Sequence, residues 1–266
     1  MRRSEPIFRG AGVALVTLFD DLGAVDVTAT VAHAVSVVER GVRAVLLAGT
    51  TGEFWALTES DRVELVRAAR AALPADVPVL AGTGADDVSD AARMTAAAAA
   101  AGADALLVLP PRGAADLLGY YTAVVDAAAG RPVLGYHMPT VSPPGLGLDS
   151  LGALPVDGIK ESSLDPRRLL AELDIFTDNV YTGVDSLLSY ACPLGCSGSL
   201  GALANVAPEL SVAAFAGDAS AQRRLSPIER SALERFPLGL KKILHEQAGT
   251  STALGRGTAE LLEAGA

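Results

Sequence analysis

The chain has 266 residues, is 50% hydrophobic, and carries 31 acidic against 21 basic residues for a formal net charge of −10. This length fits one α/β barrel or two smaller domains, but the Pro- and Gly-containing stretches are short and regularly spaced, which indicates turns rather than an interdomain linker. The apolar fraction excludes a disordered chain, and the acidic balance without a basic, aromatic stripe argues against a nucleic-acid partner.

We expect neither a membrane span nor an exported protein. The longest apolar run, at 95–101, is alanine-rich and far short of the roughly 20 residues that a spanning helix needs. Residues 1–10 hold arginines but no apolar core of signal-peptide length. Cys192 and Cys196 are too few for a disulfide framework or a zinc site, so we expect two packed thiols, no metal and a reducing cytoplasm.

Short apolar runs alternate along the chain with longer segments of helical period, which predicts parallel strands joined by crossover helices. Eight runs are the number that closes a barrel, and their continuous hydrophobicity predicts strands buried on both faces. The predicted strands are Val13–Leu18, Ala44–Ala48, Pro78–Ala81, Ala105–Leu109, Pro132–Tyr136, Gly158–Lys160, Val180–Gly183 and Gly198–Leu203. The predicted helices between and after them include Val27–Arg40, Glu59–Leu73, Val88–Ala101, Asp116–Ala129, Pro166–Leu173 and Pro208–Ala216.

A doubly wound open sheet is the main alternative. It predicts a Gly-rich phosphate turn after the first strand, where the chain has Leu18-Phe19-Asp20-Asp21 instead. The pattern therefore favours a TIM (β/α)8 barrel over residues 1–217. Beyond about Asp218 the alternation stops, and residues 218–266 are predicted as a C-terminal helical tail with helices at Pro227–Phe236 and Leu238–Gln247.

Lys160 stands at the end of the sixth predicted strand, and in a parallel barrel the active site lies at the C-terminal ends of the strands. It is one of only three lysines against eighteen arginines, and we expect the other two, Lys241 and Lys242, to be solvated on the tail helices. Arginine supplies charge but does not form an imine with a ketone. Burial of a lysine in the mouth of a barrel removes water from its ammonium group and so favours the uncharged amine. An ion pair with Glu161 is the structural alternative.

Two further strand ends carry hydroxyl groups suited to imine chemistry. Tyr136 ends the fifth strand, and a phenol that both donates and accepts protons suits imine formation, although a buried tyrosine with a satisfied hydroxyl is an alternative. Thr50 and Thr51 follow the second strand between Gly49 and Gly52 and offer hydroxyls and close-set amides for a carboxylate. A tight turn without an anion site is the simpler interpretation of that loop.

Five ordered motifs carry a family resemblance over roughly residues 8–217. Together they resemble the dihydrodipicolinate synthase/N-acetylneuraminate lyase (DapA-like) family, which are Schiff-base class I aldolases built on a TIM barrel. The motifs are G-T-T-G-E at 49–53 with Leu57-Thr58, Y-x-x-P at 136–139, G-I-K-E-S at 158–162, Y-T-G-x-D at 181–185 and A-N-V-A-P at 204–208.

The resemblance implies that Lys160 forms the imine with pyruvate or the 2-oxo end of a substrate. Tyr136 would relay protons with Thr50, and Thr51 with Gly49 and the neighbouring amides would hold the carboxylate. Gly183 and Leu200 would line the floor near the imine. The resemblance also implies a cofactor-free, metal-free lyase that forms a homo-oligomer, a tetramer or dimer.

The chain departs from the family's synthases in two loops. They carry Pro-Tyr-Tyr after strand four, where this chain reads Pro110-Pro111-Arg112-Gly113, and the later tyrosines at 120 and 121 are not expected to replace it. They also carry an arginine two residues after the Y-x-x-P proline, where this chain has Val141, and His137 replaces a common asparagine.

These departures favour a lyase or aldolase acting on a 2-oxo acid, either a 2-dehydro-3-deoxy sugar acid or another pyruvate adduct. The alternative within the family is 4-hydroxy-tetrahydrodipicolinate synthase, which condenses pyruvate with aspartate semialdehyde. An alternative of another class is a non-catalytic barrel that binds a 2-oxo acid.

Overall fold

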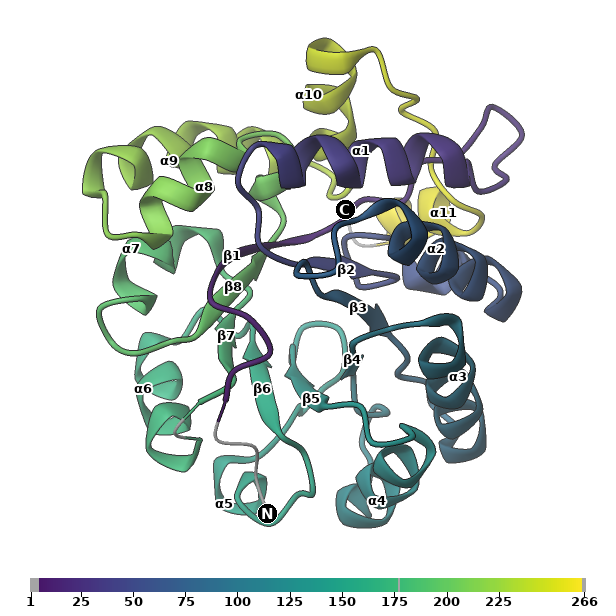
Figure 1. The fold of residues 1–266 in the computed structure, drawn as a ribbon, viewed down its shortest axis with the longest axis vertical. Coiled ribbons are helices and arrows are strands. Elements are labelled where there is room, and N and C mark those ends of the chain that lie inside the picture. Colours follow the sequence, from purple (N-terminus) through teal and green to yellow (C-terminus); the bar gives the residue numbers. More distant parts are fainter. Residues whose placement is uncertain (1–4, 177, 265–266) are drawn as a thin grey trace.

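A computed structural model describes residues 5–176 and 178–264 and shows eight parallel strands closed into a barrel in chain order (Figure 1). The predicted TIM (β/α)8 barrel is thereby confirmed. The strands are β1 Gly10–Ala14, β2 Val45–Leu47, β3 Val79–Gly82, β4 Ala105–Val108, β5 Val133–His137, β6 Gly158–Glu161, β7 Val180–Thr182 and β8 Gly198–Gly201.

The helices ring the strands, with α9 packed against α8 (Figure 1). Several helices begin at residues that favour a helix N-terminus. Thr58 and Asp61 form a reciprocal capping box at the start of α2 (Glu59–Ala72), and Asp165 caps α6 (Pro166–Ile175) ahead of Pro166. The helices are α1 Val27–Glu39, α2 Glu59–Ala72, α3 Val88–Ala101, α4 Leu117–Ala127, α5 Leu148–Leu151, α6 Pro166–Ile175, α7 Leu188–Ala191, α8 Pro208–Phe215, α9 Ala219–Leu233, α10 Leu238–Ala248 and α11 Thr258–Ala264.

The first strand begins three residues earlier than the apolar run at 13–18 predicts. It pairs with β8 from Gly10 opposite Gly198 to Val13 opposite Gly201. A Cβ atom at Gly12 would lie 2.8 Å from the carbonyl oxygen of Ser199, so the strand uses glycine where the two backbones approach closely. Because glycine has no side chain, the start of this strand gives no hydrophobic signal in the sequence.

The first tail helix also begins earlier than predicted. It starts at Ala219, where the Asp218 side chain accepts hydrogen bonds from the backbone of the first turn, and continues through Pro227. Proline ordinarily interrupts a helix because it offers no N–H to the carbonyl four residues earlier. Both Arg223, which carries that carbonyl, and Pro227 are exposed, so water can satisfy the group. The prediction of a helix start at Pro227 was therefore wrong.

Two apolar clusters form the core. The larger lies between the strands and the surrounding helices. The smaller fills the barrel interior with inward side chains from alternating strand positions, as a packed barrel requires. Its buried members are Phe8, Ala14, Ala44, Leu46, Leu80, Ala105, Leu107, Leu134, Tyr136, Tyr181 and Leu200.

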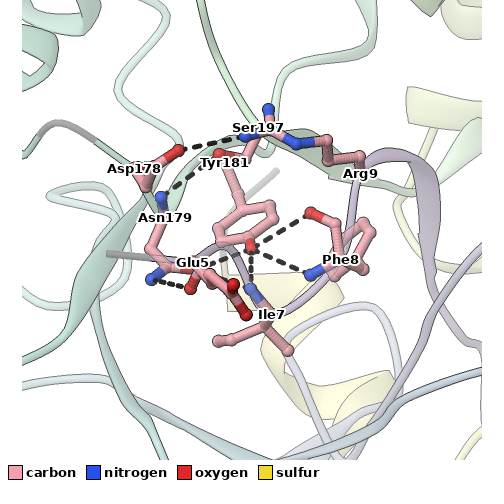
Figure 2. A network of polar contacts seen from close by, with 8 residues as sticks. All are labelled: Glu5, Ile7, Phe8, Arg9, Asp178, Asn179, Tyr181 and Ser197. Atoms are coloured by element: carbon pink, nitrogen blue, oxygen red, sulfur yellow. Dashed lines mark hydrogen bonds and ion pairs between the residues drawn. The ribbon is translucent and has the colours of Figure 1, made fainter. Parts of the chain in front are cut away.

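The segment before β1 forms a network of polar contacts with residues at the start of β7 (Figure 2). The backbone N–H groups of Ile7 and Phe8 donate to the hydroxyl of Tyr181 at 3.0 and 3.3 Å, and Ile7 also donates to Oδ1 of Asn179 at 2.7 Å. The Phe8 ring stacks on Tyr181 with 4.7 Å between centroids. These residues lie at the N-terminal end of the barrel strands, whereas Lys160 lies toward the C-terminal end.

The two cysteines flank the turn between α7 and β8. Cys192 follows the last residue of α7 and Cys196 lies just before β8, and both thiols are free. Within the described ranges, no helix has the length and apolar character that a membrane span requires. Across residues 5–176 and 178–264, no three His, Cys, Asp or Glu side chains gather as a metal site.

Candidate active site

Lys160 and Tyr136 are neighbours across the β5–β6 ladder and point into the barrel. The two residues are register partners, and period-2 alternation directs Ile159 and Glu161 outward. Nζ of Lys160 lies 4.5 Å from the centroid of the Tyr136 ring. Each residue is only 4% exposed, so the amine sits in a nearly dry site beside a phenol.

Thr50 joins this pair from the turn after β2. Its Oγ1 lies 3.3 Å from the Tyr136 hydroxyl, within hydrogen-bond distance. The turn is tight because the N–H of Gly52 donates to the carbonyl of Gly49 at 3.1 Å. Thr51 is buried in the same turn. The structure thus brings the predicted Thr50–Tyr136–Lys160 group together.

Gly183 and Leu200 lie where the resemblance implies a floor. A Cβ atom at Gly183 would be 2.7 Å from Cε of Lys160 and 2.0 Å from Oγ of Ser162, so only glycine leaves room for the lysine stem. Leu200 is 1% exposed and packs in the same interior cluster as Tyr136. Both residues therefore lie against the side chains of the candidate site.

Met138 is a site residue that the sequence did not single out. Its Sδ lies 2.8 Å from the Tyr136 hydroxyl and 3.6 Å from Oγ1 of Thr50. A thioether is a weak acceptor with no proton to pass on. Its signal in the sequence was its place inside the Y-x-x-P motif, next to the phenol. The thioether therefore lies against both hydroxyls of the candidate site.

Asp185, the last residue of the Y-T-G-x-D motif, places a carboxyl group near the lysine. Its Oδ2 accepts hydrogen bonds from the backbone N–H groups of Ala202 and Leu203 at 2.9 and 3.1 Å. Burial raises the pKa of Asp185 to about 6, against the opposing pull of those N–H donors and the Lys160 charge. This carboxyl group joins the ends of β7 and β8 beside the candidate site.

His137 lies next to Tyr136 in the chain but faces the other side of the sheet. Its Nδ1 accepts a hydrogen bond from the N–H of Leu146 at 2.9 Å, and burial lowers the pKa of His137 to about 4. Arg168 donates to the carbonyl of Leu146 at 2.6 Å and to Glu161 at 2.9 Å. A neutral His137 and Arg168 therefore anchor the loop between β5 and α5.

The loop after β4 packs on its own chain. The Ser142 hydroxyl donates to the carbonyl of Pro110 at 2.6 Å, and Arg112 donates to the carbonyl of Val141 at 3.0 Å. The hydroxyls of Tyr120 and Tyr121 donate to backbone carbonyls at 2.9 and 2.8 Å. The Tyr121 hydroxyl also bonds the backbone of Tyr136, but the bonds of both tyrosines are to backbone groups and not to the Tyr136 hydroxyl.

A small pocket of about 20 Å³, open to solvent, adjoins Thr50 and Tyr136. Its walls are mostly apolar side chains and backbone, with one charged group, the guanidinium of Arg62. Sequence reasoning did not identify Arg62, because it lies on α2, away from any strand end. The lining residues are Ala48, Gly49, Thr50, Phe54, Arg62, Gly82, Gly84, Leu107, Leu109 and Tyr136.

Comparison with known proteins identifies relatives across nearly the whole chain. The model of the dihydrodipicolinate synthetase family matches residues 7–250. An uncharacterized DapA-like lyase from Halobacterium salinarum is 35% identical over 251 residues, covering 91% of this chain and 82% of the relative. The 4-hydroxy-tetrahydrodipicolinate synthase of Stutzerimonas stutzeri is 33% identical over 255 residues, covering 89% and 87%.

The fold has the same relatives. The crystal structure of the chloride-inhibited dihydrodipicolinate synthase from Acinetobacter baumannii, complexed with pyruvate, superposes with a TM-score of 0.83 at 25% identity, covering 97% of each chain. Sequence and fold therefore agree. The chain belongs to the dihydrodipicolinate synthetase family and is a carbon–carbon lyase of the class I aldolase type.

Proposed function

We propose that the enzyme forms an imine between Nζ of Lys160 and the keto carbon of pyruvate, or of the 2-oxo end of a larger acid. The observation that carries this proposal is the position of Lys160. Its side chain is only 4% exposed and its amine lies over the Tyr136 ring, whose hydroxyl is within hydrogen-bond distance of Thr50. The amine adds to the carbonyl, the carbinolamine loses water, and a protonated imine results.

The protonated imine then acts as an electron sink. In the cleavage direction, the substrate carries a hydroxyl on the second carbon from the imine carbon. This hydroxyl loses its proton, and the bond between its carbon and the carbon next to the imine breaks. The electron pair of that bond moves into the imine to give an enamine. An aldehyde leaves, the enamine takes a proton, and water releases pyruvate. Tyr136 and Thr50 move the protons, as hydroxyls in mutual contact can do.

The remaining predicted residues bind the substrate. Thr51, with Gly49 and the neighbouring amides of the turn, holds the carboxylate next to the keto group, because close-set backbone N–H groups suit an anion. Gly183 and Leu200 form the floor against the lysine stem. These roles need no cofactor and no metal ion.

A 2-dehydro-3-deoxy sugar acid, or a related pyruvate adduct, is the substrate class that we propose first. The loops after β4 and β5 lack the synthases' tyrosine pair and arginine, and Val141 stands where that arginine is expected. The second candidate, 4-hydroxy-tetrahydrodipicolinate synthase, is favoured by relatives of that name at about 33% identity. A non-catalytic barrel that binds a 2-oxo acid has no use for an imine-forming amine.

We further propose a cytoplasmic homo-oligomer, a tetramer or dimer, in which residues 1–217 carry the chemistry and residues 218–266 support the barrel. The family resemblance supports the assembly, and the contact between Lys241 and the turn after β2 supports the role of the tail. Light scattering during size-exclusion chromatography measures the assembly directly, and a monomer at micromolar concentration would contradict it.

Borohydride reduction in the presence of pyruvate tests the imine. We expect mass spectrometry to find one reduced pyruvate adduct, on the peptide that contains Lys160. Lys160→Arg should abolish the adduct, whereas Lys242→Arg, at an exposed position, should not. No adduct on the wild-type enzyme would reject the mechanism. Pyruvate release from sugar acids, measured beside turnover with aspartate semialdehyde, then separates the two substrate classes.

A further inference from the structure

Arg62 presents a half-buried positive charge to the pocket beside the candidate site. It reaches the pocket from the first turns of α2, and the same pocket is lined by Thr50 and Tyr136. Tyr136 lines this pocket and its ring centroid lies 4.5 Å from Nζ of Lys160, so the pocket adjoins the position of the proposed imine. Arg62 is the only charged residue among those that line it.

The guanidinium is held by backbone groups rather than by an acid. Nη2 donates to the carbonyl of Phe54 at 2.7 Å and Nη1 donates to the carbonyl of Gly82 at 3.3 Å. The group also lies 5.8 Å from the centroid of the Phe54 ring. Its Nε is buried without a hydrogen-bond partner. These contacts fix the direction of the side chain and leave donor capacity unused.

No carboxylate of the described chain neutralises this charge. Glu59, the acid that lines a neighbouring cavity with Arg62, pairs with Arg93 instead. Burial lowers the pKa of Arg62 to about 10, with no opposing effect from a nearby acid, so the group remains charged at neutral pH. A half-buried guanidinium without an acidic partner is stabilised by an anion that enters beside it.

The rest of the pocket suits the carbon chain that would precede such an anion. Leu107 and Leu109 supply apolar walls, and Gly82 and Gly84 leave no side chain in the way. A Cβ atom at Gly84 would lie 2.5 Å from the carbonyl oxygen of Leu109, so the wall is closely packed there. The pocket therefore combines apolar walls with one cationic side chain.

We propose that Arg62 binds a second carboxylate of the substrate, so that the aldehyde half of the reaction is an aldehyde acid. This inference rests on the proposed function and narrows the substrate to pyruvate adducts that carry a second carboxylate. Arg62 is then the group that selects substrates with an acid at the far end, in a chain that has Val141 in the loop after β5 where the family's synthases have an arginine. A guanidinium is suited to this role because its planar donors match carboxylate geometry.

The test compares two four-carbon aldehydes, one that ends in a carboxylate and one that ends in a methyl group. Condensation of pyruvate with 4-oxobutanoate and with butanal is followed by pyruvate consumption, and the ratio of the two kcat/KM values is the readout. We expect the wild-type enzyme to prefer the anion by on the order of 10–100-fold, since a charged hydrogen bond that lacks its partner loses about that much. A wild-type ratio near one overturns the proposal.

Variants locate the preference. Arg62→Gln should bring the ratio close to one, mainly by raising KM for 4-oxobutanoate, and Arg62→Lys should give an intermediate ratio. Arg67→Gln on the exposed face of the same helix removes the same charge and should leave the ratio unchanged. A folded Arg62→Gln enzyme that keeps the wild-type ratio shows that Arg62 only ties two carbonyls together, and overturns the proposal.

Two measurements separate this inference from the proposed mechanism. The reduced pyruvate adduct on Lys160 should still form in Arg62→Gln, because the arginine lies beyond the imine. Succinate binding by calorimetry reports on Arg62 without any chemistry, and we expect its Kd to rise by on the order of 10-fold in Arg62→Gln. An absent adduct in the wild type rejects the mechanism, whereas equal succinate affinities in wild type and variant reject the role of Arg62.

Discussion

The ammonium group of Lys241 and the carboxylate of Glu53, 188 residues apart, form an ion pair from which solvent is excluded. Both side chains are 0% exposed. Nζ of Lys241 also donates to the carbonyl of Ala253 at 2.8 Å, and Oε2 of Glu53 accepts from the N–H of Gly255 at 2.8 Å. The expectation that Lys241 is solvated was therefore wrong. Helix α10 and the segment after it hold the turn that carries Thr50.

Breaking this pair should destabilise the protein and disturb the turn. Lys241→Met leaves a buried, unpaired carboxylate, which costs about 3–5 kcal/mol. In a chain of this size that corresponds to a fall in Tm of roughly 6–20 °C. Differential scanning calorimetry measures the fall, and we expect kcat to drop with it at temperatures where the variant is folded.

Two variants serve as controls for that prediction. Lys242→Met changes the adjacent, exposed lysine and should leave Tm within about 2 °C of the wild type. The double variant Lys241→Met with Glu53→Leu removes both charges and should recover much of the loss. A double variant no more stable than Lys241→Met alone would show that Lys241 acts through its other contacts.

The Tyr136 hydroxyl should matter to the chemical step. Tyr136→Phe keeps the ring beside Nζ of Lys160 and removes only the group that contacts Thr50 and Met138. We expect kcat to fall by on the order of 10²–10⁴-fold, the usual contribution of a positioned acid or base. Tyr120→Phe removes a hydroxyl that bonds the carbonyl of Ala85 and should lower stability with little change in kcat. Equal kcat losses in the two variants would contradict the assignment.

Met138 should close the relay rather than extend it. Because a thioether has no proton to transfer, Met138→Leu, which keeps a similar volume, should leave deuterium exchange into the methyl group of pyruvate within about threefold of the wild type. Nuclear magnetic resonance in D₂O follows the exchange. Met94→Leu, on α3, is the matched control. A loss of about 100-fold in Met138→Leu alone would mean that the sulfur is needed to orient the phenol.

Glu172 should make the protein less stable in alkaline solution. Nε of Arg168 lies 2.9 Å from carboxylate oxygens of both Glu161 and Glu172, so one arginine faces two buried acids. Burial, followed by the Glu161 charge, raises the pKa of Glu172 from 4.5 to about 9. The folded protein thus holds this proton more tightly than the unfolded chain does. The resulting stability is complete below pH 4.5 and is lost progressively toward pH 9.

Glu172→Gln mimics the protonated acid at every pH. Its Tm should match that of the wild type near pH 4.5 and exceed it by a margin that widens up to about pH 9. Glu64→Gln, at an exposed position on α2, should show no such trend. Parallel Tm curves for Glu172→Gln and the wild type across this range would show that Glu172 is ionised in the folded protein.

The barrel and the inner site could be predicted from the sequence because both depend on local patterns. Alternation of apolar strands and amphipathic helices leads to a parallel barrel. Once the strands pair in register, period-2 alternation places Tyr136 and Lys160 side by side within the barrel. Thr50 follows from its place in a tight turn at a strand end. Strand bounds were less predictable where glycine replaces side chains, as at Gly10 and Gly12.

The sequence by itself thus determined the architecture and the lysine, tyrosine and threonine at its mouth. Only the tertiary structure decided which groups the charged and sulfur-containing side chains meet. Lys241 pairs with Glu53, Arg62 lines the pocket without an acidic partner, and Met138 contacts two hydroxyls. Periodicity records which face of an element is buried. It does not record what that face meets across the fold, because the contact partner of a buried polar group is set by how distant elements pack.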